Sequence, residues 1–283
     1  MFIAQVSHNG RSGIGISDDG KSFRCDLSSG STSDEAVLKA AEARTISAGS
    51  ISIDAGELRF LPPLTMPPKI VCVGLNYAEH SRETGFEVPS YPTIFARFAS
   101  GLIGHEQPMI RPTVSEQLDF EGELVAVIGR GGRNIPKAAA LDHVLGYSLF
   151  NDGSIRDYQR MTPQWTIGKN FDGTGSFGPW IVTADRLPPG CEGLNLQTRL
   201  NGKVVQSAST NDLIFDVATL ISKLSETFTL SRGDVIVTGT PSGVGAARKP
   251  PLWMKPGDVC EVEVDHVGIL RNTIVDEAVD AST

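Results

Sequence analysis

Cysteine is scarce in this sequence of 283 residues, and its four cysteines lie far apart at positions 25, 72, 191 and 260. None belongs to a C-x-x-C pair, which excludes a zinc ribbon or the disulfide framework of a small secreted domain. We expect free, buried thiols in a reducing compartment. The sequence also lacks an apolar run of about 18 residues and a basic segment followed by an apolar one near Met1. These absences predict a cytoplasmic protein with no membrane partner.

Positive charge is in deficit. The chain has 25 Lys and Arg against 33 Asp and Glu, a net charge of −8, and its longest basic run is Arg248-Lys249. Nucleic-acid binding depends on clustered basic residues, so we exclude it. None of the five histidines forms a pair with the spacing of zinc ligands. The glycine-rich segment 238–245 lacks both phosphate-loop and dinucleotide signatures, although its amides remain candidates for binding a small anion.

Glycine, in contrast, is abundant, with 30 residues or about 11% against a typical value of about 7%. Without a repeat, this excess indicates many turns and therefore a strand-rich fold. Four prolines between Phe60 and Pro68 predict an extended connector. We therefore expect a small N-terminal accessory domain over residues 1–65, a main domain over residues 69–275 and a flexible tail over residues 276–283.

The pattern of apolar residues predicts short elements of both kinds. Strands are expected over residues 2–6, 13–17, 69–73, 119–129, 144–151, 235–238 and 260–264, and helices over residues 33–43, 76–84, 136–143 and 211–226. The last helix is the clearest, because the apolar residues from Leu213 to Leu224 recur with the helical period. Strands and helices do not alternate regularly, so a doubly wound sheet is excluded.

Two acidic residues on the strand over residues 119–129 are unusual. Residues two apart on a strand share a face, so Glu121 and Glu123 point the same way, with Val125 and Val127 continuing that face and Phe120 and Leu124 on the other. Two carboxylates crowded on a covered face need a cation, and oxygen ligands suit Mg²⁺, Mn²⁺ or Ca²⁺. A solvated acidic edge is the alternative. Asp152, which follows an apolar strand, is a third candidate ligand or a helix cap.

A second candidate site is the helix over residues 76–84. His80 and Glu83 are three residues apart and are therefore neighbours on one helical face. A carboxylate beside an imidazole orients the ring and strengthens it as a base. Most such pairs are only surface neighbours, so the spacing does not decide their role. Lys169, in a loop rich in glycine and aromatic residues, is either functional or a surface charge.

Taken in order, five motifs resemble those of the fumarylacetoacetate hydrolase family. They are Gly74-Leu-Asn-Tyr77 with His80 and Glu83, Asp119-Phe-Glu-Gly-Glu-Leu124, the stretch from Asn151-Asp152 to Arg156-Asp157, Gln164-Trp165 with Gly168–Asp172, and Thr238–Gly245 preceded by Asn201-Gly202. The likeness spans residues 69–275. It implies an α+β fold built on a mixed β-roll with flanking helices and a small N-terminal domain, a homodimer, and a bound Mg²⁺ or Mn²⁺.

The resemblance also assigns roles to residues. It implies that Glu121, Glu123 and Asp152 hold the metal, that His80 and Glu83 activate water on a lid helix, and that Lys169 steadies a developing oxyanion. Positions that hold the substrate or support the site are Arg156, Gln159 and Thr240. The sequence departs from the family's pattern at Gly153, Ile155 and Arg97, where Arg97 replaces a frequent lysine. These departures are expected to flank the pocket and to affect substrate identity.

The implied reaction is metal-dependent hydrolysis of a C–C bond in an acylpyruvate such as fumarylpyruvate, within aromatic-compound catabolism. A divalent metal chelated by a 2-oxo acid favours this chemistry because it stabilises the pyruvate-type enolate that is released. The alternatives on the same site are decarboxylation or tautomerisation of oxaloacetate, and isomerisation or hydration of a 2-hydroxymuconate-type dienoate. A non-enzymatic metal-binding protein is the remaining alternative.

Overall fold

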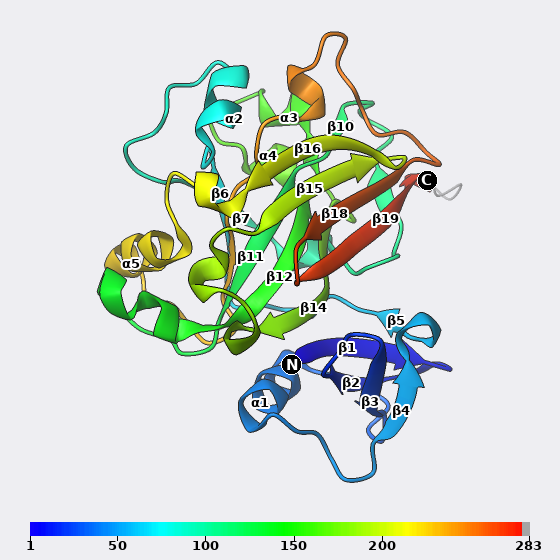
Figure 1. Cartoon of the computed structure of the whole chain (residues 1–283). Coiled ribbons are helices and arrows are strands. Elements are labelled where there is room, and N and C mark those ends of the chain that lie inside the picture. The colour runs from blue at the N-terminus through cyan, green and yellow to red at the C-terminus, as the bar shows by residue number, and fades with distance from the viewer. Residues whose placement is uncertain (279–283) are drawn as a thin grey trace.

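The computed structural model describes residues 1–278 and shows a strand-rich molecule with few helices (Figure 1). It confirms the expected α+β class. The N-terminal segment forms a smaller lobe built from β1 (Phe2–His8), β2 (Arg11–Ser17), β3 (Ser22–Asp26), α1 (Asp34–Ala43), β4 (Ile51–Asp54) and β5 (Arg59–Phe60). Helix α1 begins at Asp34 because the Ser33 hydroxyl accepts a hydrogen bond from the Ala36 amide.

The largest sheet has twelve strands and runs through both lobes. Its main path is β4-β3-β2-β1-β14-β12-β11-β17-β6-β7, while β5 pairs with β1 and β8 with β14. The strands of the main lobe are β6 (Ile70–Gly74), β7 (Thr93–Arg97), β8 (Leu102–Ile103), β11 (Gly122–Ile128), β12 (Val144–Asp152), β14 (Gly175–Thr183) and β17 (Val235–Val237). Antiparallel pairing of Phe2 with Val182 and of Ile3 with Ile181 joins the N-terminal lobe to the rest.

Two smaller sheets and four further helices complete the main lobe. The five-stranded sheet contains β16 (Lys203–Ser209), β15 (Asn195–Leu200), β18 (Val259–Val264), β19 (Gly268–Asp276) and β9 (Met109–Arg111), in that order. The two-stranded sheet pairs β10 (Leu118–Asp119) with β13 (Ser154–Ile155). The helices are α2 (Ala78–Glu83), α3 (Arg156–Gln159), α4 (Thr166–Lys169) and α5 (Val217–Thr227). Short 3-10 turns cover Ala55–Glu57, Ala99–Gly101, Lys137–His143, Ala184–Arg186, Pro189–Cys191, Thr210–Asp212 and Gly245–Ala247.

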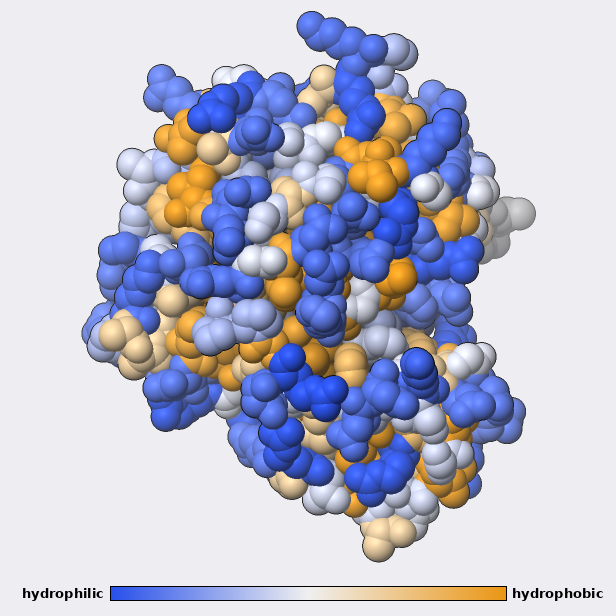
Figure 2. All heavy atoms as spheres, viewed as in Figure 1, coloured by the Kyte–Doolittle hydropathy of each residue, from blue (hydrophilic) through white to orange (hydrophobic). Residues whose placement is uncertain are grey.

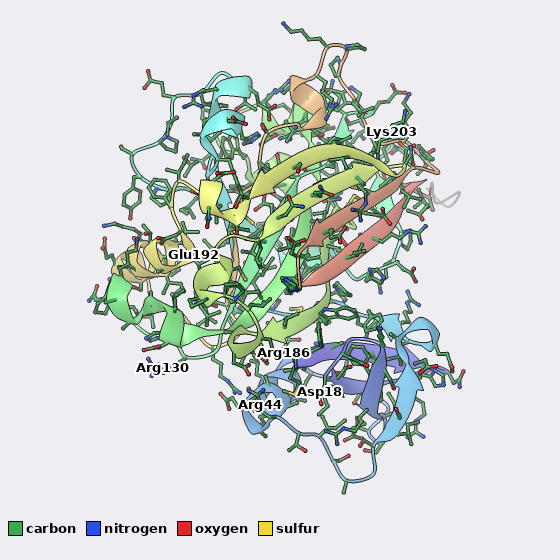
Figure 3. The ribbon with its side chains drawn as sticks, in the orientation of Figure 1. Asp18, Arg44, Arg130, Arg186, Glu192 and Lys203 are labelled. Carbon is green, nitrogen blue, oxygen red and sulfur yellow. The ribbon has the colours of Figure 1, made fainter. Side chains whose placement is uncertain are left out.

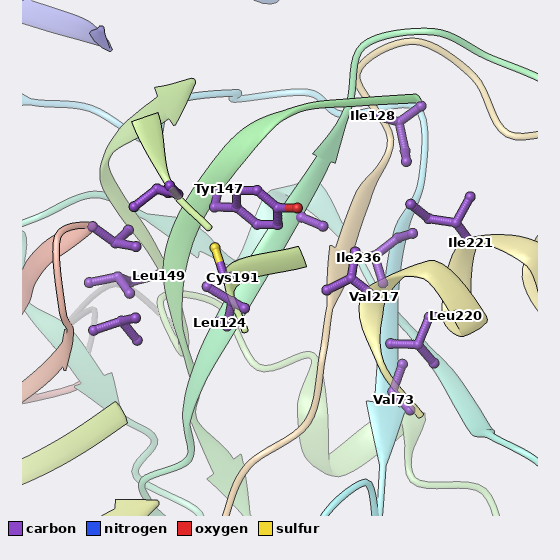
Figure 4. Packing of buried hydrophobic residues seen from close by; sticks show 14 of the residues in the cluster. Val73, Leu124, Ile128, Tyr147, Leu149, Cys191, Val217, Leu220, Ile221 and Ile236 are labelled. Atoms are coloured by element: carbon purple, nitrogen blue, oxygen red, sulfur yellow. The ribbon is translucent and has the colours of Figure 1, made fainter. Parts of the chain in front are cut away.

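Strand β11 is covered on both faces and lies at the centre of the main lobe. Leu124, Ala126 and Ile128 pack into a cluster with α5 and the five-stranded sheet, part of which Figure 4 shows. Val125 and Val127, on the other face, pack into a second cluster that includes residues of α1 and β1. The expectation that the acidic face of this strand is also covered is therefore confirmed. All four cysteines are free and buried, as expected.

One expected strand is interrupted. The strand predicted over residues 119–129 divides into β10 and β11, because the amide of Glu121 donates to the side-chain oxygen of Asn151. Phe120 consequently leaves the face of Leu124 and packs with Leu118 and Ile155 instead. Our placement of Phe120 beside Leu124 was wrong, since a break of this kind resets the alternation of faces.

The predicted start of the longest helix was also wrong. Helix α5 begins at Val217 rather than at residue 211 or 212, because Asp216 accepts a hydrogen bond from the Thr219 amide and caps the helix. The residues before it are held in place by a distant partner. The amide of Phe215 donates to the side-chain oxygen of Asn76, and the amide of Ile214 donates to the backbone carbonyl of Asn76. Local periodicity does not reveal a contact between residues so far apart in the chain.

Polar contacts line the seam between the two lobes. Figure 3 shows Asp18 and Arg44 of the N-terminal lobe near Arg186 of the main lobe, where the Arg186 guanidinium donates to the Asp18 carbonyl and Arg44 pairs with Asp185. Figure 2 shows that hydrophilic side chains cover most of this face of the molecule, with apolar residues in small groups. No helix among residues 1–278 is long and apolar enough to cross a membrane. The expected tail lies mostly outside the described residues, although Asp276 is the last residue of β19.

We propose that the boundary between the lobes lies in the proline connector, residues 61–68. A chain beginning at Pro68 is then expected to fold, but with a lower melting temperature than the full chain, because Ile3 no longer covers Ile181 and β14 becomes an exposed edge. Thermal unfolding of the two chains followed by circular dichroism measures this difference. If the shorter chain does not fold at all, the lobes form one cooperative unit and the proposed boundary is wrong.

Candidate active site

The three acidic residues singled out in the sequence meet at the end of β11. Glu121 precedes this strand, Glu123 lies on it, and Asp152 is the last residue of the neighbouring strand β12. The backbone amide of Asp152 donates to the Glu121 carbonyl. Each offers a carboxylate oxygen, and these oxygens lie within 4.8 Å of one another. All three side chains are buried, and Asp152 is completely so. They therefore do not form a solvated acidic edge.

Three buried cations surround this cluster. The Lys169 ammonium, at the end of α4, lies 2.7 Å from a Glu121 oxygen and 2.6 Å from an Asp152 oxygen. The Arg156 guanidinium lies 2.6 Å from the other Glu121 oxygen. Arg97 donates to the second Asp152 oxygen at 2.5 Å. Charges buried together in this way are tolerated only because each has an opposite charge within contact distance.

The cations do not neutralise the three carboxylates equally. Burial alone would raise the pKa of Glu121, but Lys169 and Arg156 outweigh it and lower that pKa to about 2. The pKa of Glu123 is raised, because it is buried and faces the negative charges of Asp152 and Glu121. Its partner is the backbone amide of Gly239, at 2.5 Å. Glu123 is thus the member of the cluster that most needs an additional cation.

This donor set fits a divalent metal. Three carboxylates with oxygens within one coordination sphere, and no nitrogen or sulfur ligand among them, match the preference of Mg²⁺ and Mn²⁺. The raised pKa of Glu123 agrees with such a site. A bound cation would offset the repulsion between Glu123 and the other two carboxylates, which is one cause of the raised pKa. Glu121, Glu123 and Asp152 would therefore hold the ion.

His80 and Glu83 are also brought together. They lie on α2, with 2.9 Å between the imidazole Nδ1 and a Glu83 oxygen, and His80 is buried. Both Glu83 oxygens accept from the amide of Gly243, at 2.9 and 3.0 Å, and Glu79 faces the Ser242 hydroxyl. These contacts fix the helix against the glycine-rich loop and set the orientation of the imidazole.

The glycine-rich loop binds anions that belong to the protein itself. Its backbone amides donate to three carboxylates: Gly239 to Glu123, Gly243 to Glu83, and Gly245 with Ala246 to Asp119. We had left open whether these amides receive a small anion. The structure shows that the loop instead connects the acidic cluster with the His80–Glu83 pair.

A cavity of about 720 Å³ brings these groups to a common space. The sequence-predicted residues that line it are His80, Glu121, Glu123, Arg156, Gln159, Lys169 and Thr240. Gln159 accepts a hydrogen bond from Arg156, and the Thr240 hydroxyl donates to the Gly122 carbonyl. Asp152 and Glu83 lie behind this lining and hold Lys169 and His80 in place.

The sequence misled us about the role of Arg97, and it did not lead us to the role of Asp119. Arg97 does not merely flank the pocket: its buried guanidinium also donates to the Gly153 carbonyl and the Thr174 hydroxyl, so it fixes the Asp152 carboxylate. Asp119 was read only as part of a motif, yet it anchors both Arg156 and the glycine-rich loop. A signal was available for Asp119, which stands next to the Glu121 cluster in sequence. Arg97 approaches from β7 and had no local signal.

Removing one carboxylate tests the metal site. We expect Glu123→Gln to weaken Mn²⁺ binding by more than the roughly 10- to 100-fold that loss of an outer-shell partner costs, because a direct ligand is lost. Isothermal titration of the metal-free protein measures this affinity. The matched control is Glu116→Gln, which changes an exposed carboxylate that is not part of the cluster and should bind like the parent. Equal affinities for both variants would show that Glu123 is not a ligand.

Arg97 gives a second test, on stability. We expect Arg97→Met to lower the free energy of unfolding of the metal-free protein by about 3–5 kcal/mol, because Asp152 stays buried with one cation fewer. Arg97→Lys should lose less, since it keeps the charge but not the fork of donors. Urea unfolding measures both variants. The exposed Arg24→Met is the control, with an expected change within about 0.5 kcal/mol. A similar small effect of Arg97→Met would contradict the role given to Arg97.

Comparison with known proteins identifies relatives of this chain. Residues 69–275 match the family described as fumarylacetoacetate (FAA) hydrolase C-terminal. The human mitochondrial oxaloacetate tautomerase FAHD2A is 41% identical over 243 residues, which cover 85% of this chain and 77% of that protein. An uncharacterised protein of Archaeoglobus fulgidus is 46% identical over 218 residues, covering 77% of this chain and 82% of that one.

Solved structures resemble the whole chain. The fumarylacetoacetate hydrolase of Exiguobacterium antarcticum superposes with a TM-score of 0.86 at 34% identity, covering 98% of this chain and 100% of that one. The 5-carboxymethyl-2-hydroxymuconate delta-isomerase of Mycobacterium smegmatis superposes with a TM-score of 0.80 at 31% identity, covering 99% of this chain and all of the other. The match over residues 69–275 and these relatives show that the chain belongs to the fumarylacetoacetate hydrolase family.

Proposed function

We propose that this chain is a divalent-metal-dependent tautomerase or isomerase that moves a proton at the carbon next to the keto group of a 2-oxo acid, with oxaloacetate as the simplest substrate. The observation that carries the proposal is that Glu121 and Glu123 of the buried three-carboxylate cluster line the same cavity as His80, whose imidazole is held by Glu83. The relatives support it, since they include an oxaloacetate tautomerase and a hydroxymuconate isomerase.

The residues divide the work as follows. Mg²⁺ or Mn²⁺ held by Glu121, Glu123 and Asp152 would act as a Lewis acid on the substrate's carboxylate and keto oxygens. His80, oriented by Glu83, removes the proton from the carbon next to the keto group and returns it elsewhere on the same system. The Lys169 ammonium stays protonated, because Asp152 and Glu121 overcome the effect of burial and raise its pKa. It therefore offers positive charge to the oxygen on which negative charge develops.

The substrate's other polar groups meet side chains that are already fixed. Arg156 is held by Asp119 and Gln159, so it is preorganised for a carboxylate or a carbonyl oxygen. Thr240 is held by Gln206 and by the Gly122 carbonyl. Groups whose hydrogen bonds are set before the substrate arrives cost little to reorganise during the reaction.

Hydrolysis of an acylpyruvate such as fumarylpyruvate, the reaction first expected from the resemblance, remains the second candidate. The observation that favours it is the same His80–Glu83 pair, which is equally suited to take a proton from water. In that case the imidazole acts on water rather than on carbon, and pyruvate leaves as the enolate. A role in aromatic-compound catabolism follows from this candidate.

The remaining assignments are proposals that rest on the resemblance and on composition. We propose a homodimer, as in the family, and a small-molecule 2-oxo acid as the binding partner. The four buried free thiols suit a reducing compartment, so we propose the cytoplasm as the location. Of the named relatives, the human tautomerase is mitochondrial.

Changing His80 to alanine tests the base. Its loss should lower kcat for oxaloacetate tautomerisation, or for acylpyruvate hydrolysis, by about 10²–10⁴-fold, the usual contribution of general-base catalysis. Decarboxylation of oxaloacetate needs no such base and should fall much less. Metal affinity should be unchanged, because the ligands lie on other elements. The reactions are followed by ultraviolet absorbance with Mg²⁺.

The control is His8→Ala, which removes a half-buried imidazole of the N-terminal lobe and should leave every rate unchanged. Small and equal losses for tautomerisation, hydrolysis and decarboxylation in His80→Ala would mean that His80 is not the base. A parent protein that binds Mg²⁺ but turns over none of these acids would favour the non-enzymatic alternative.

A further inference from the structure

A closed ring of hydrogen bonds holds the backbone of Gly122, the residue between Glu121 and Glu123. The Gly122 amide donates to Gln206 Oε1 at 3.0 Å, and Gln206 Nε2 donates to Thr240 Oγ1 at 2.8 Å. The Thr240 hydroxyl closes the ring by donating to the Gly122 carbonyl at 3.0 Å. Both side chains are buried. The ring therefore lies in the protein interior and includes the residue that joins two members of the acidic cluster.

The chemistry of the partners allows only one arrangement of this ring. A backbone amide can only donate, so the Gly122 amide requires the oxygen end of the Gln206 side chain. The Pro241 carbonyl can only accept, and it receives the nitrogen end at 2.8 Å. Thr240 consequently accepts from Gln206 and uses its single proton on the Gly122 carbonyl. Loss of the Gln206 amide would leave buried donors and acceptors without partners, which is costly.

A β-bulge directs Gln206 to this position. Gln206 lies on β16, the edge strand of the five-stranded sheet, and pairs with Thr198 of β15. The register shifts next to this pair and leaves Val205 as an extra residue, and bulges of this kind re-aim side chains beside active sites. The Val205 carbonyl packs against the glycine-rich loop, since a Cβ built on Gly243 would lie 2.2 Å from it. Gln206 thus connects the smaller sheet with both β11 and the glycine-rich loop.

The backbone of Gly122 needs such a restraint. The ladder between β11 and β17 runs from Val125 to Val127 and ends before it reaches Gly122. A Cβ at this position would lie 2.1 Å from Thr198 Oγ1, so glycine is required, and glycine has the greatest backbone freedom of all residues. Rotation about its backbone would turn the two flanking carboxylates relative to each other. The ring therefore sets how these carboxylates face each other.

We propose that Gln206 is a positioning residue for the metal site, which fixes the Gly122 backbone and with it the spacing of the Glu121 and Glu123 carboxylates. The inference rests on the proposed metal site and adds a residue that belongs neither to the carboxylate cluster nor to the lining of the cavity. Loss of an outer-shell partner that orients metal ligands typically costs about 10- to 100-fold in metal affinity. We expect an effect of this size for Gln206.

The test measures Mn²⁺ affinity of the metal-free, full-length protein by isothermal titration. Gln206→Met keeps the length of the side chain but removes the amide, and should weaken Mn²⁺ binding by about 10- to 100-fold. The matched control is Gln197→Met, the same change at a half-buried position of the neighbouring strand β15, which should bind like the parent. The electron paramagnetic resonance spectrum of bound Mn²⁺ reports the geometry of its ligands. It should change in Gln206→Met and match the parent in Gln197→Met.

A second pair of variants opens the ring at its other side chain. Thr240→Val removes the hydroxyl and should weaken Mn²⁺ binding, whereas Thr240→Ser keeps the hydroxyl and should stay close to the parent. The double variant with Gln206→Met and Thr240→Val should lose about as much affinity as the weaker-binding single variant, because residues of one hydrogen-bonded network are not additive. The Thr240 pair also carries the test if Gln206→Met does not fold.

The outcomes separate this inference from the proposed function. If Gln206→Met has a lower melting temperature but binds Mn²⁺ like Gln197→Met, Gln206 is only structural and the inference is overturned, while the proposed function stands. Equal affinities for Thr240→Val and Thr240→Ser also overturn it. A weakened affinity in Gln206→Met, together with a parent that turns over no 2-oxo acid, supports the positioning role and overturns the proposed function. A parent that binds no Mn²⁺ overturns both.

Discussion

The structure depends on the burial of several carboxylates in one small volume. Glu121, Glu123 and Asp152 meet at the end of β11, and taking even one unpaired carboxylate out of water is costly. The fold meets this cost with cations that come from three separate elements: Arg97 from β7, Arg156 from α3 and Lys169 from α4. The need to neutralise the cluster therefore fixes how these short elements are placed around the large sheet.

The three carboxylates are not neutralised equally, and this difference bears on the proposed function. Glu121 is held ionised by two cations, whereas Glu123 has a raised pKa and a backbone amide as its partner. A structural cluster would be expected to pair every charge, since an unpaired one destabilises the protein. A site that leaves one carboxylate in need of a cation is suited to bind a metal ion and, through it, a chelating acid.

Much of this arrangement was predictable, and the parts that were not share a cause. Alternation along the strand placed Glu121 and Glu123 together, and helical spacing placed His80 beside Glu83, because both patterns act over a few residues. Its position after an apolar strand made Asp152 a candidate third ligand or a helix cap, and only the family resemblance assigned Asp152 and Lys169 to the cluster. The position of the segment before α5, held by Asn76, and the contact of Arg97 with Asp152 depend on residues far apart in sequence. Such contacts leave no periodic signal in the chain.

The glycine-rich loop holds the His80–Glu83 pair and the acidic cluster in fixed positions relative to each other, although they lie on different elements. Its amides bind Glu123 at one end and Glu83 at the other, so a shift of the loop would move the proposed metal ligand and the partner of the imidazole together. This coupling is the same whether His80, as the proposed base, takes a proton from carbon or from water. The chemistry at the reacting end therefore does not distinguish a tautomerase from a hydrolase. That choice depends on which substrate reaches the imidazole and in what orientation.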